Sequence, residues 1–235
     1  MDKKIKVHPA QVEILKVLLF RPEARFAELN TLGLATDHLT FHIKSLVKAG
    51  LVVKKENGVY VLTADGKEFA NRFDMDSEKS ELERQAKIGV LVCAVREENG
   101  EKQFLAQQRL KQPYFGFYGF ITGKVKWGEV VSETAARELK EESGLSGNLT
   151  LRGIKHKMDY SEKGRLLEDK YFFVFKAERL KGKLIENFEG GKNIWLSRAE
   201  ILNLPNLFDG VDESIEMVLS TKLIFSETKY KVKGY

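Results

Sequence analysis

The sequence predicts an α+β protein of two domains, and three observations lead to this prediction. A length of 235 residues suits two domains of about 75 and 150 residues, each with its own core. Residues 9–49 repeat apolar side chains at helical spacing, and two short valine-rich runs then flank the dipeptide Asn57-Gly58. Beyond residue 87, apolar runs such as 88–95 are typical of buried strands, and one helix combines an apolar face with many glutamates.

The N-terminal third begins with three predicted helices. The first starts at Pro9, carries apolar residues three and four positions apart, and ends at Arg21-Pro22, because proline cannot continue a helix. A short second helix fits residues 24–29, and a third fits residues 36–49 before Gly50. The third helix should bury four apolar side chains, those of Leu39, Ile43, Leu46 and Val47.

A β-hairpin and a fourth helix follow. Residues 51–55 and 59–63 are expected to form two strands, since Asn-Gly is the strongest short hairpin signal. Thr63 should cap a fourth helix that runs from Ala64 to about residue 73. Three helices followed by a two-stranded hairpin form the order of a winged helix-turn-helix domain, which we assign to residues 1–76.

Residues 8–73 resemble the small winged-helix repressors of bacteria and archaea. The resemblance lies in Leu-Val-Lys-Ala-Gly-Leu-Val at 46–52 and in Tyr-Val-Leu-Thr-Ala-Asp-Gly at 60–66. In that family the third helix enters the major groove and the wing contacts the backbone, which implies double-stranded DNA as a partner. The outward-facing candidates for DNA contact are His38, Thr40, Phe41, His42, Lys44, Ser45, Lys48, Lys54 and Lys55.

Charge argues for a second interpretation of the same domain. Residues 1–76 hold 12 lysines and arginines against 10 aspartates and glutamates, which is a weak electrostatic footprint for a DNA-binding protein. Winged helices also serve as protein-interaction modules, so a homodimer is an alternative. His38 and His42 lie one helical turn apart and could bind a metal, but DNA contact or solvation is favoured in a chain with one cysteine and four histidines.

The most informative stretch of the chain runs from Gly123 to Leu145. It places Glu138, Glu141 and Glu142 on one side of one helix, because residues three and four positions apart are neighbours. Like charges so placed repel each other, and a divalent cation such as Mg²⁺, which takes oxygen ligands, reverses that effect. The helix should dock through an apolar face made of Val131, Ala135 and Leu139 and end at Gly144.

The spacing of this stretch matches the Nudix box, so residues 87–235 resemble the Nudix hydrolase family. The matching positions are Gly123, Glu129, Arg137, Glu138, Leu139, Glu141, Glu142, Gly144 and Leu145. The resemblance implies an α/β/α sandwich with a mixed sheet and Mg²⁺- or Mn²⁺-dependent hydrolysis of a nucleoside diphosphate linked to another moiety. Many members begin the box with Pro-Gly-Gly where this chain has Ile121-Thr122-Gly123, which should alter the stiffness of the loop more than the chemistry.

The resemblance also assigns roles to individual residues. Family members bind metal through the glutamates that match Glu138, Glu141 and Glu142, often with the carbonyl group that here belongs to Thr122. Arg137 and Glu129 match the pair that holds or orients these ligands.

A carboxylate outside the helix often serves as general base or further ligand. Glu189 is the best candidate, because members commonly place a glutamate several residues before a strand that bears a tryptophan, here Trp195. Glu186, Glu168 and Asp169 are the alternatives.

Candidates for substrate contact lie around the start of the box. They are Arg109, Gly123, Tyr118 and Phe120. Arg109 could reach a phosphate or be an ordinary surface arginine. The aromatic residues between positions 114 and 120 could stack on a nucleobase, or they could form a core strand and turn.

The remaining sequence indicates where the two domains join and in which compartment the protein is expected. A charged linker is expected at residues 77–86, within a stretch that is poor in large apolar residues. No apolar run is long enough for a membrane helix and no signal-peptide pattern is present, so we expect a cytoplasmic protein without a membrane partner.

Two functions therefore compete. The first is an active hydrolase whose winged helix binds DNA or dimerises. The second is a transcription regulator that senses a nucleotide metabolite through its Nudix domain. Regulators that pair these domains usually place the Nudix part first and often have an eroded box, whereas here the order is reversed and the box is intact. A pyrophosphohydrolase acting on the 5′ end of a nucleic acid ranks third.

Overall fold

A computed structural model describes residues 8–72 and 85–233 of the chain. The chain divides into two compact units, Met1–Arg84 and Gln85–Tyr235. The linker expected at residues 77–86 lies almost entirely outside the described residues. Within the described ranges, no helix is long and apolar enough to cross a membrane.

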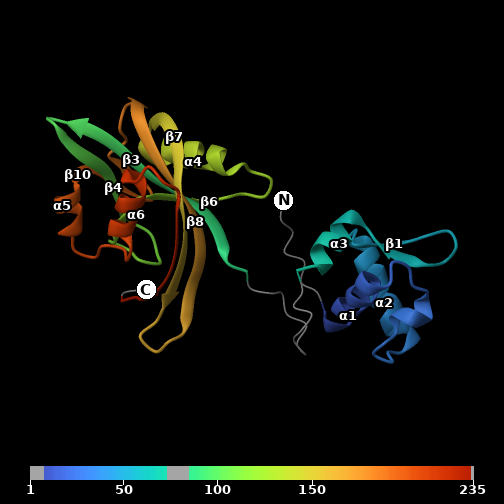
Figure 1. The fold of residues 1–235 in the computed structure, drawn as a ribbon. Helices are drawn as coiled ribbons and strands as arrows, with labels where there is room; N and C mark the ends of the chain where they lie inside the picture. The colour runs from blue at the N-terminus through green and yellow to red at the C-terminus, as the bar shows by residue number, and fades with distance from the viewer. Residues whose placement is uncertain (1–7, 73–84, 234–235) are drawn as a thin grey trace. The chain divides into compact units, whose positions relative to one another are not determined.

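The N-terminal unit combines helices with a two-stranded antiparallel sheet (Figure 1). The order of helices and hairpin expected from the sequence is observed, and the helical turn after α1 is a 3₁₀-helix, η1. The elements are α1 (Pro9–Phe20), η1 (Phe26–Leu29), α2 (Thr36–Lys48), β1 (Val52–Lys54), β2 (Tyr60–Leu62) and α3 (Ala64–Ala70).

Local sequence explains where these helices begin and end. His8 caps α1 by accepting a hydrogen bond from the amide of Ala10 at 3.2 Å, and the helix stops at Arg21, before Pro22. Thr63 caps α3, as expected, by accepting from the amide of Gly66 at 2.9 Å. Apolar side chains from all three α-helices and the hairpin meet in one buried core.

Two details of this unit differ from expectation. The predicted helix at residues 24–29 is shortened to η1, because Ala24 instead pairs with Tyr60 through two backbone hydrogen bonds of 3.1 and 2.8 Å. Val47 was expected on the buried face of α2, but it lies at the edge of the apolar stripe and is 40% exposed. Leu39, Ile43 and Leu46 are buried as expected.

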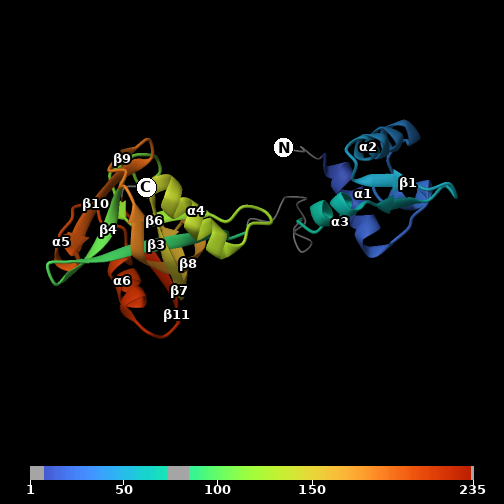
Figure 2. The same ribbon diagram turned by 90° about the horizontal axis from the view of Figure 1, so that it is seen from above.

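The C-terminal unit is built on one large sheet (Figures 1 and 2). Its strands are β3 (Lys87–Glu98), β4 (Glu101–Arg109), β5 (Tyr118–Gly119), β6 (Ile121–Lys124), β7 (Leu145–Tyr160), β8 (Leu166–Gly182), β9 (Asn187–Phe188), β10 (Gly191–Ser197) and β11 (Ile224–Lys231). Its helices are α4 (Val131–Ser143), α5 (Arg198–Leu202) and α6 (Val211–Leu219).

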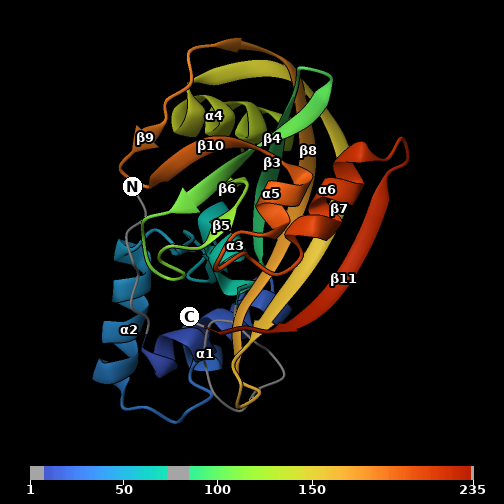
Figure 3. The ribbon, with the colours of Figure 1, turned by 90° about the vertical axis from the view of Figure 1, so that its left-hand side faces the viewer.

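The sheet is mixed. Its main order is β11-β7-β8-β3-β4-β10-β9, while β5 pairs with β4 and β6 pairs with β3. The pairs β11/β7 and β3/β8 are parallel and the others are antiparallel. Strand β11 lies along the outer edge of the sheet beside β7 (Figure 3).

Helices cover both faces of this sheet, and β3 shows how one strand serves both layers. Val90, Val92 and Ala94 pack in the same buried cluster as Ala135 and Leu139 of α4. Cys93 and Val95, on the opposite face of the strand, pack in the cluster that contains Ile215 of α6. The α+β fold with an α/β/α sandwich and a mixed sheet is therefore confirmed (Figure 2).

Candidate active site

The box predicted from the sequence forms a strand, a loop and a helix beside a cavity. Strand β6 leads into the loop, α4 follows it, and Gly144 ends the helix in the left-handed conformation, with φ of +75°. The cavity has a volume of about 650 Å³, a size typical of small-molecule sites. Thr122, Gly123, Glu138 and Glu142 all line it.

Glu138 lies directly over Gly123. A Cβ atom built on Gly123 would lie 2.0 Å from the carboxyl carbon of Glu138, so only glycine leaves room for this carboxylate. The start of the box and the middle of α4 are thereby held in close contact. The glycine that begins the pattern is required by packing against the carboxylate of Glu138.

Arg137 connects the carboxylates of the box. Its guanidinium donates two hydrogen bonds to Glu129, at 2.6 and 2.9 Å, in the bidentate geometry that arginine favours. Its Nη1 atom also donates to Glu138 at 2.6 Å and to Glu141 at 3.2 Å. The hydrogen bonds from Arg137 and from the amide of Lys126 lower the pKa of Glu129 to about 2, so Glu129 is ionised at neutral pH.

Glu142 is a half-buried carboxylate at the wall of the cavity. Burial raises its pKa, and the negative charge of Glu138 adds to the effect. Gln107 of β4 donates to Glu142 Oε2 at 3.0 Å. Asn193 of β10 donates at 2.7 Å to the backbone carbonyl of Glu142 and at 2.7 Å to that of Ile185. These amides fix the end of α4 against the sheet.

Sequence reasoning missed Gln107 and Asn193. They stand opposite each other in the β4/β10 pair, 86 positions apart in the chain, and Gln107 also donates to Asn193 at 3.3 Å. Neither residue stands out in the sequence, because β4 and β10 carry several other polar side chains. Only the strand register shows that both lie near Glu142.

Helix geometry separates the three glutamates. Glu138 and Glu142 share the cavity, while Glu141 lies outside its lining with a side chain that is 59% exposed. Each residue turns the helix by 100°, so positions 141 and 142 lie on opposite sides of position 138 when viewed along the helix axis. Among the described residues, no three His, Cys, Asp or Glu side chains are grouped closely enough to hold a metal ion.

The other site candidates lie at different places around the cavity. Arg109 lines it, and its guanidinium donates to the carbonyls of Pro113 and Gln112 at 2.7 and 3.1 Å. Phe120 lines it and belongs to the buried core, whereas Tyr118 lies in β5 outside the lining. Glu189 is exposed in the turn after β9, where neighbouring Gly190 accepts a hydrogen bond from the amide of Leu110 at 2.9 Å.

The three alternatives to Glu189 differ in their position relative to the cavity. Glu168 is buried at the cavity wall and forms ion pairs with Lys87 and Lys170. Asp169 lies outside the cavity lining and contacts His156 at 2.8 Å. Glu186 is exposed in the segment before β9.

Comparison with known proteins identifies the family. A sequence model of the NUDIX domain matches residues 86–218, more than half of the chain. The chain belongs to the Nudix family. The C-terminal unit, which we now call the Nudix unit, resembles two solved structures in particular.

The first is the mutator MutT protein of Bacillus halodurans, with 26% identity and a TM-score of 0.50, covering 62% of this chain and 90% of that protein. The second is the Nudix domain of NrtR from Shewanella oneidensis, solved with ADP-ribose, with 16% identity and a TM-score of 0.51, covering 68% of this chain and all of that domain. The likeness to the second shows a shared fold.

The residues of the Nudix box fit a divalent cation. Two carboxylates line one cavity, and their mutual repulsion helps to raise the pKa of Glu142, an effect that a cation would reverse. Gly123 leaves room for the Glu138 carboxylate to lie at the cavity wall. Hard oxygen donors beside a cavity are the set that Mg²⁺ and Mn²⁺ prefer.

The DNA-contact candidates lie on α2 and the hairpin of the N-terminal unit. His38, Lys44, Lys54 and Lys55 are exposed, and Thr40 is half-buried. Several of the candidates have partners. Lys55 forms an ion pair with Glu23 at 2.7 Å, and Lys54 lies over the ring of Tyr60, 5.6 Å from its centroid. Half-buried His42 stacks on His8 with ring centroids 4.6 Å apart, and Phe41 packs edge-on against His42.

Proposed function

We propose that this protein is a Nudix hydrolase that cleaves the pyrophosphate linkage of a nucleoside diphosphate derivative with the help of Mg²⁺ or Mn²⁺. The observation that carries the proposal is the contact of Arg137 with Glu129, Glu138 and Glu141, beside a cavity that Glu138 and Glu142 line. The hydrogen bonds that hold Glu129 and Glu138 on Arg137 support catalysis in addition to ligand binding.

Each residue of the box would have a separate task. Glu138, Glu142 and the more exposed Glu141 would hold the cation, with the carbonyl of Thr122 as a further donor. When bound, the cation would neutralise phosphate oxygens and activate a water molecule. Arg137 would hold Glu138 in place while Glu129 fixes Arg137, and Gln107 would orient Glu142.

Glu189 is proposed as the general base or an additional ligand. It lies in a turn tied through Gly190 to Leu110, the residue next to cavity-lining Lys111. Glu168, the alternative inside the cavity, is engaged by two lysines. Glu189→Gln should slow turnover without changing the thermal stability, and an unchanged rate would move the role to another carboxylate.

Turnover of a substrate panel tests the proposed reaction. ADP-ribose, NADH, dinucleoside polyphosphates and oxidised nucleoside triphosphates are each incubated with Mg²⁺ or Mn²⁺. We expect hydrolysis of at least one compound and its loss in Glu142→Gln. Glu133→Gln is the matched control, because Glu133 is an exposed glutamate in the first turn of the same helix. Equal loss in both variants would contradict a site-specific role for Glu142.

The N-terminal unit supports a second candidate function. We propose that it is a winged helix-turn-helix domain spanning residues 1–76, and that it binds DNA through α2 and the hairpin or pairs two copies of the chain. The exposed face of α2 and the exposed hairpin lysines favour a nucleic-acid contact. Binding of a panel compound without turnover, together with an effect on DNA affinity, would favour a metabolite-sensing regulator.

A further inference from the structure

Three lysines stand side by side on the wall of the same cavity. Lys157 of β7 is the register partner of Lys170 of β8, and Lys170 is the register partner of Lys87 of β3. All three line the cavity, and we call this set the lysine row. Like charges directly opposite each other on adjacent strands destabilise a sheet. The lysine row therefore costs the fold stability, which suggests that the row has a function.

Burial makes the row more costly. Lys157 is only 8% exposed, and the side chain of Lys170 is 24% exposed. Burial lowers the pKa of both lysines, and in each case a neighbouring lysine adds to the effect. A buried ammonium group is tolerated when nearby negative charge compensates it.

The carboxylates next to the row compensate it incompletely. Asp159 and Glu168, also register partners, form the adjacent row on β7 and β8. Lys157 lies 3.3 Å from Asp159 and Lys170 lies 3.4 Å from Glu168, both longer than the usual 2.7–2.9 Å of a charged hydrogen bond. Glu168 is shared, because Lys87 also contacts it at 2.5 Å.

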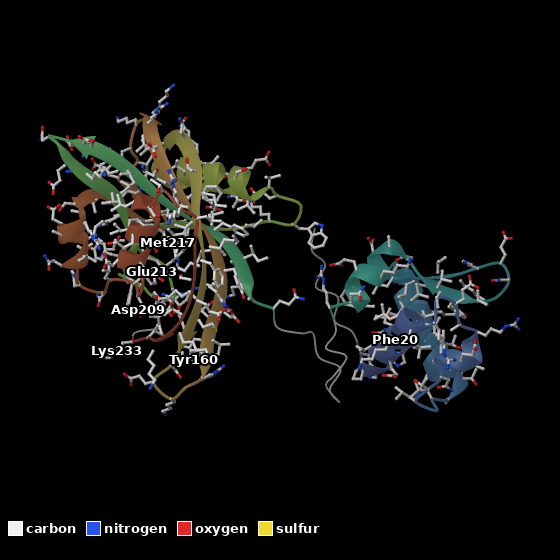
Figure 4. The ribbon with its side chains drawn as sticks, viewed as in Figure 1. Phe20, Tyr160, Asp209, Glu213, Met217 and Lys233 are labelled. Atoms are coloured by element: carbon white, nitrogen blue, oxygen red, sulfur yellow. The ribbon has the colours of Figure 1, made fainter. Side chains whose placement is uncertain are left out.

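A fourth lysine on this wall is already committed to the fold. Lys155 is 2% exposed and forms an ion pair with Glu213 of α6 at 2.7 Å. Its ammonium also donates to the carbonyl of Gly210, just before α6 begins. Asp209 and Glu213 flank the start of this helix (Figure 4). Lys155 therefore anchors β7 to α6. The negative charge of Asp209 also acts on Lys157, but the cavity as a whole keeps an excess of positive charge, since eight Lys or Arg residues line it against five Asp or Glu residues.

We propose that the lysine row binds a second anionic group of the substrate, of the phosphate class, in addition to the diphosphate placed at Glu138 and Glu142. The row and the carboxylates line one cavity, so a single extended ligand reaches both. Arg109 and Lys111 line the same cavity and add to its positive charge. The inference rests on the proposed hydrolase function and narrows it to substrates with several phosphate groups.

Metal-free binding of inorganic tripolyphosphate, measured by calorimetry, tests the row directly. We expect the parent chain to bind and each of Lys157→Gln and Lys170→Gln to weaken binding at least about tenfold, since each removes a charge-assisted contact. Lys181→Gln, an exposed lysine of the same strand β8 outside the cavity, should bind like the parent. Equal affinity in all four proteins, or no binding by the parent, would overturn the assignment.

A variant that is expected to bind tripolyphosphate more tightly distinguishes a lost anion contact from lost folding, because a misfolded protein would bind more weakly. Asp159→Asn removes the carboxylate that competes for Lys157 but keeps an oxygen to accept from the Tyr114 hydroxyl, which now donates to Asp159 at 3.0 Å. It should bind tripolyphosphate several-fold more tightly than the parent. Weaker binding by a folded Asp159→Asn protein would contradict the proposal.

Competition links the row to the substrate. Tripolyphosphate should inhibit turnover of the active panel compound competitively, with an inhibition constant that rises about tenfold in Lys157→Gln. Non-competitive inhibition would separate the row from the substrate site and overturn the proposal. If no panel compound is turned over, the hydrolase function fails, while the calorimetric result still decides whether the row binds anions.

Discussion

Gly123 and Glu138 occupy the same small space, with room for the glutamate carboxylate only because position 123 has no side chain. A Cβ atom there would lie 2.0 Å from the carboxyl carbon of Glu138, well inside any tolerated contact. The neighbouring group is the end of a flexible side chain, so the carboxylate would move while the backbone stays in place. Position 123 therefore controls the position of Glu138.

Gly123→Ala should disable the enzyme and leave it folded. A displacement of about 1 Å at a reacting group is enough to cost on the order of a hundredfold in rate. We expect kcat to fall by about that factor, with a far-ultraviolet circular dichroism spectrum like that of the parent. Kinetics against the active panel compound check this, and parent-like turnover would contradict the control of Glu138 by position 123.

Arg137→Lys should separate charge from geometry. Lysine keeps the positive charge and the helix propensity of arginine, but it lacks the fork that contacts Glu129 twice and Glu138 once. We expect kcat to fall roughly ten- to hundredfold, as for other residues that orient metal ligands, with little change in Tm. A Tm loss that accounts for the whole activity loss would show a purely structural role.

The sequence was sufficient to predict contacts within the box, because they lie within one helix and its flanking loop. Spacing placed Glu138 beside Glu142, and the resemblance to the Nudix box assigned Arg137 and Glu129 to hold or orient the glutamates. The exposed position of Glu141 outside the cavity did not follow, since that depends on how α4 is rotated against the sheet.

Contacts between strands could not be read in this way. Gln107 meets Asn193 because of the register between strands that lie far apart in the chain, which the alternation of polar and apolar residues does not specify. Lys157 meets Lys170 because of the register of the antiparallel pair β7/β8, which the turn between these strands sets. The same limit applies to residues 24–29, where pairing of Ala24 with Tyr60 replaced the first turn of a predicted helix. In each case a tertiary contact decided the structure.

His156 should make the stability of the Nudix unit depend on pH. Its ring joins three strands, with Nδ1 2.6 Å from Glu227 of β11 and Nε2 2.8 Å from Asp169 of β8. Burial by itself lowers the pKa of His156, but the hydrogen bonds to Glu227 and Asp169 outweigh it and raise the pKa. The stabilisation is therefore complete below the unfolded value of about 6.5 and is lost as pH rises through the folded pKa.

His156→Gln should consequently destabilise the protein most at mildly acidic pH. We expect a loss of about 2 kcal/mol near pH 5.5, or roughly 4–8 °C in Tm, that shrinks as the pH rises toward 9. Thermal unfolding across this range measures it, with exposed His38→Gln as the control. A Tm difference that is the same at every pH would show that the histidine acts in its neutral form.

Replacing Lys54 and Lys55 together by alanine tests the nucleic-acid hypothesis for the N-terminal unit. Both are exposed at the end of β1 and in the turn after it, where a wing would contact phosphates. The double variant should weaken DNA binding by a similar factor for all sequences and reduce the salt slope by about 1 to 2, because each lysine that neutralises a phosphate releases about one counterion. Lys55 must first leave Glu23, so its share of the effect should be the smaller.

Lys67→Ala, which replaces an exposed lysine on α3, is the matched control and should bind DNA like the parent. Fluorescence anisotropy with duplex DNA at several salt concentrations gives both quantities. An affinity that is independent of salt in the parent would assign the hairpin to contact with another protein chain.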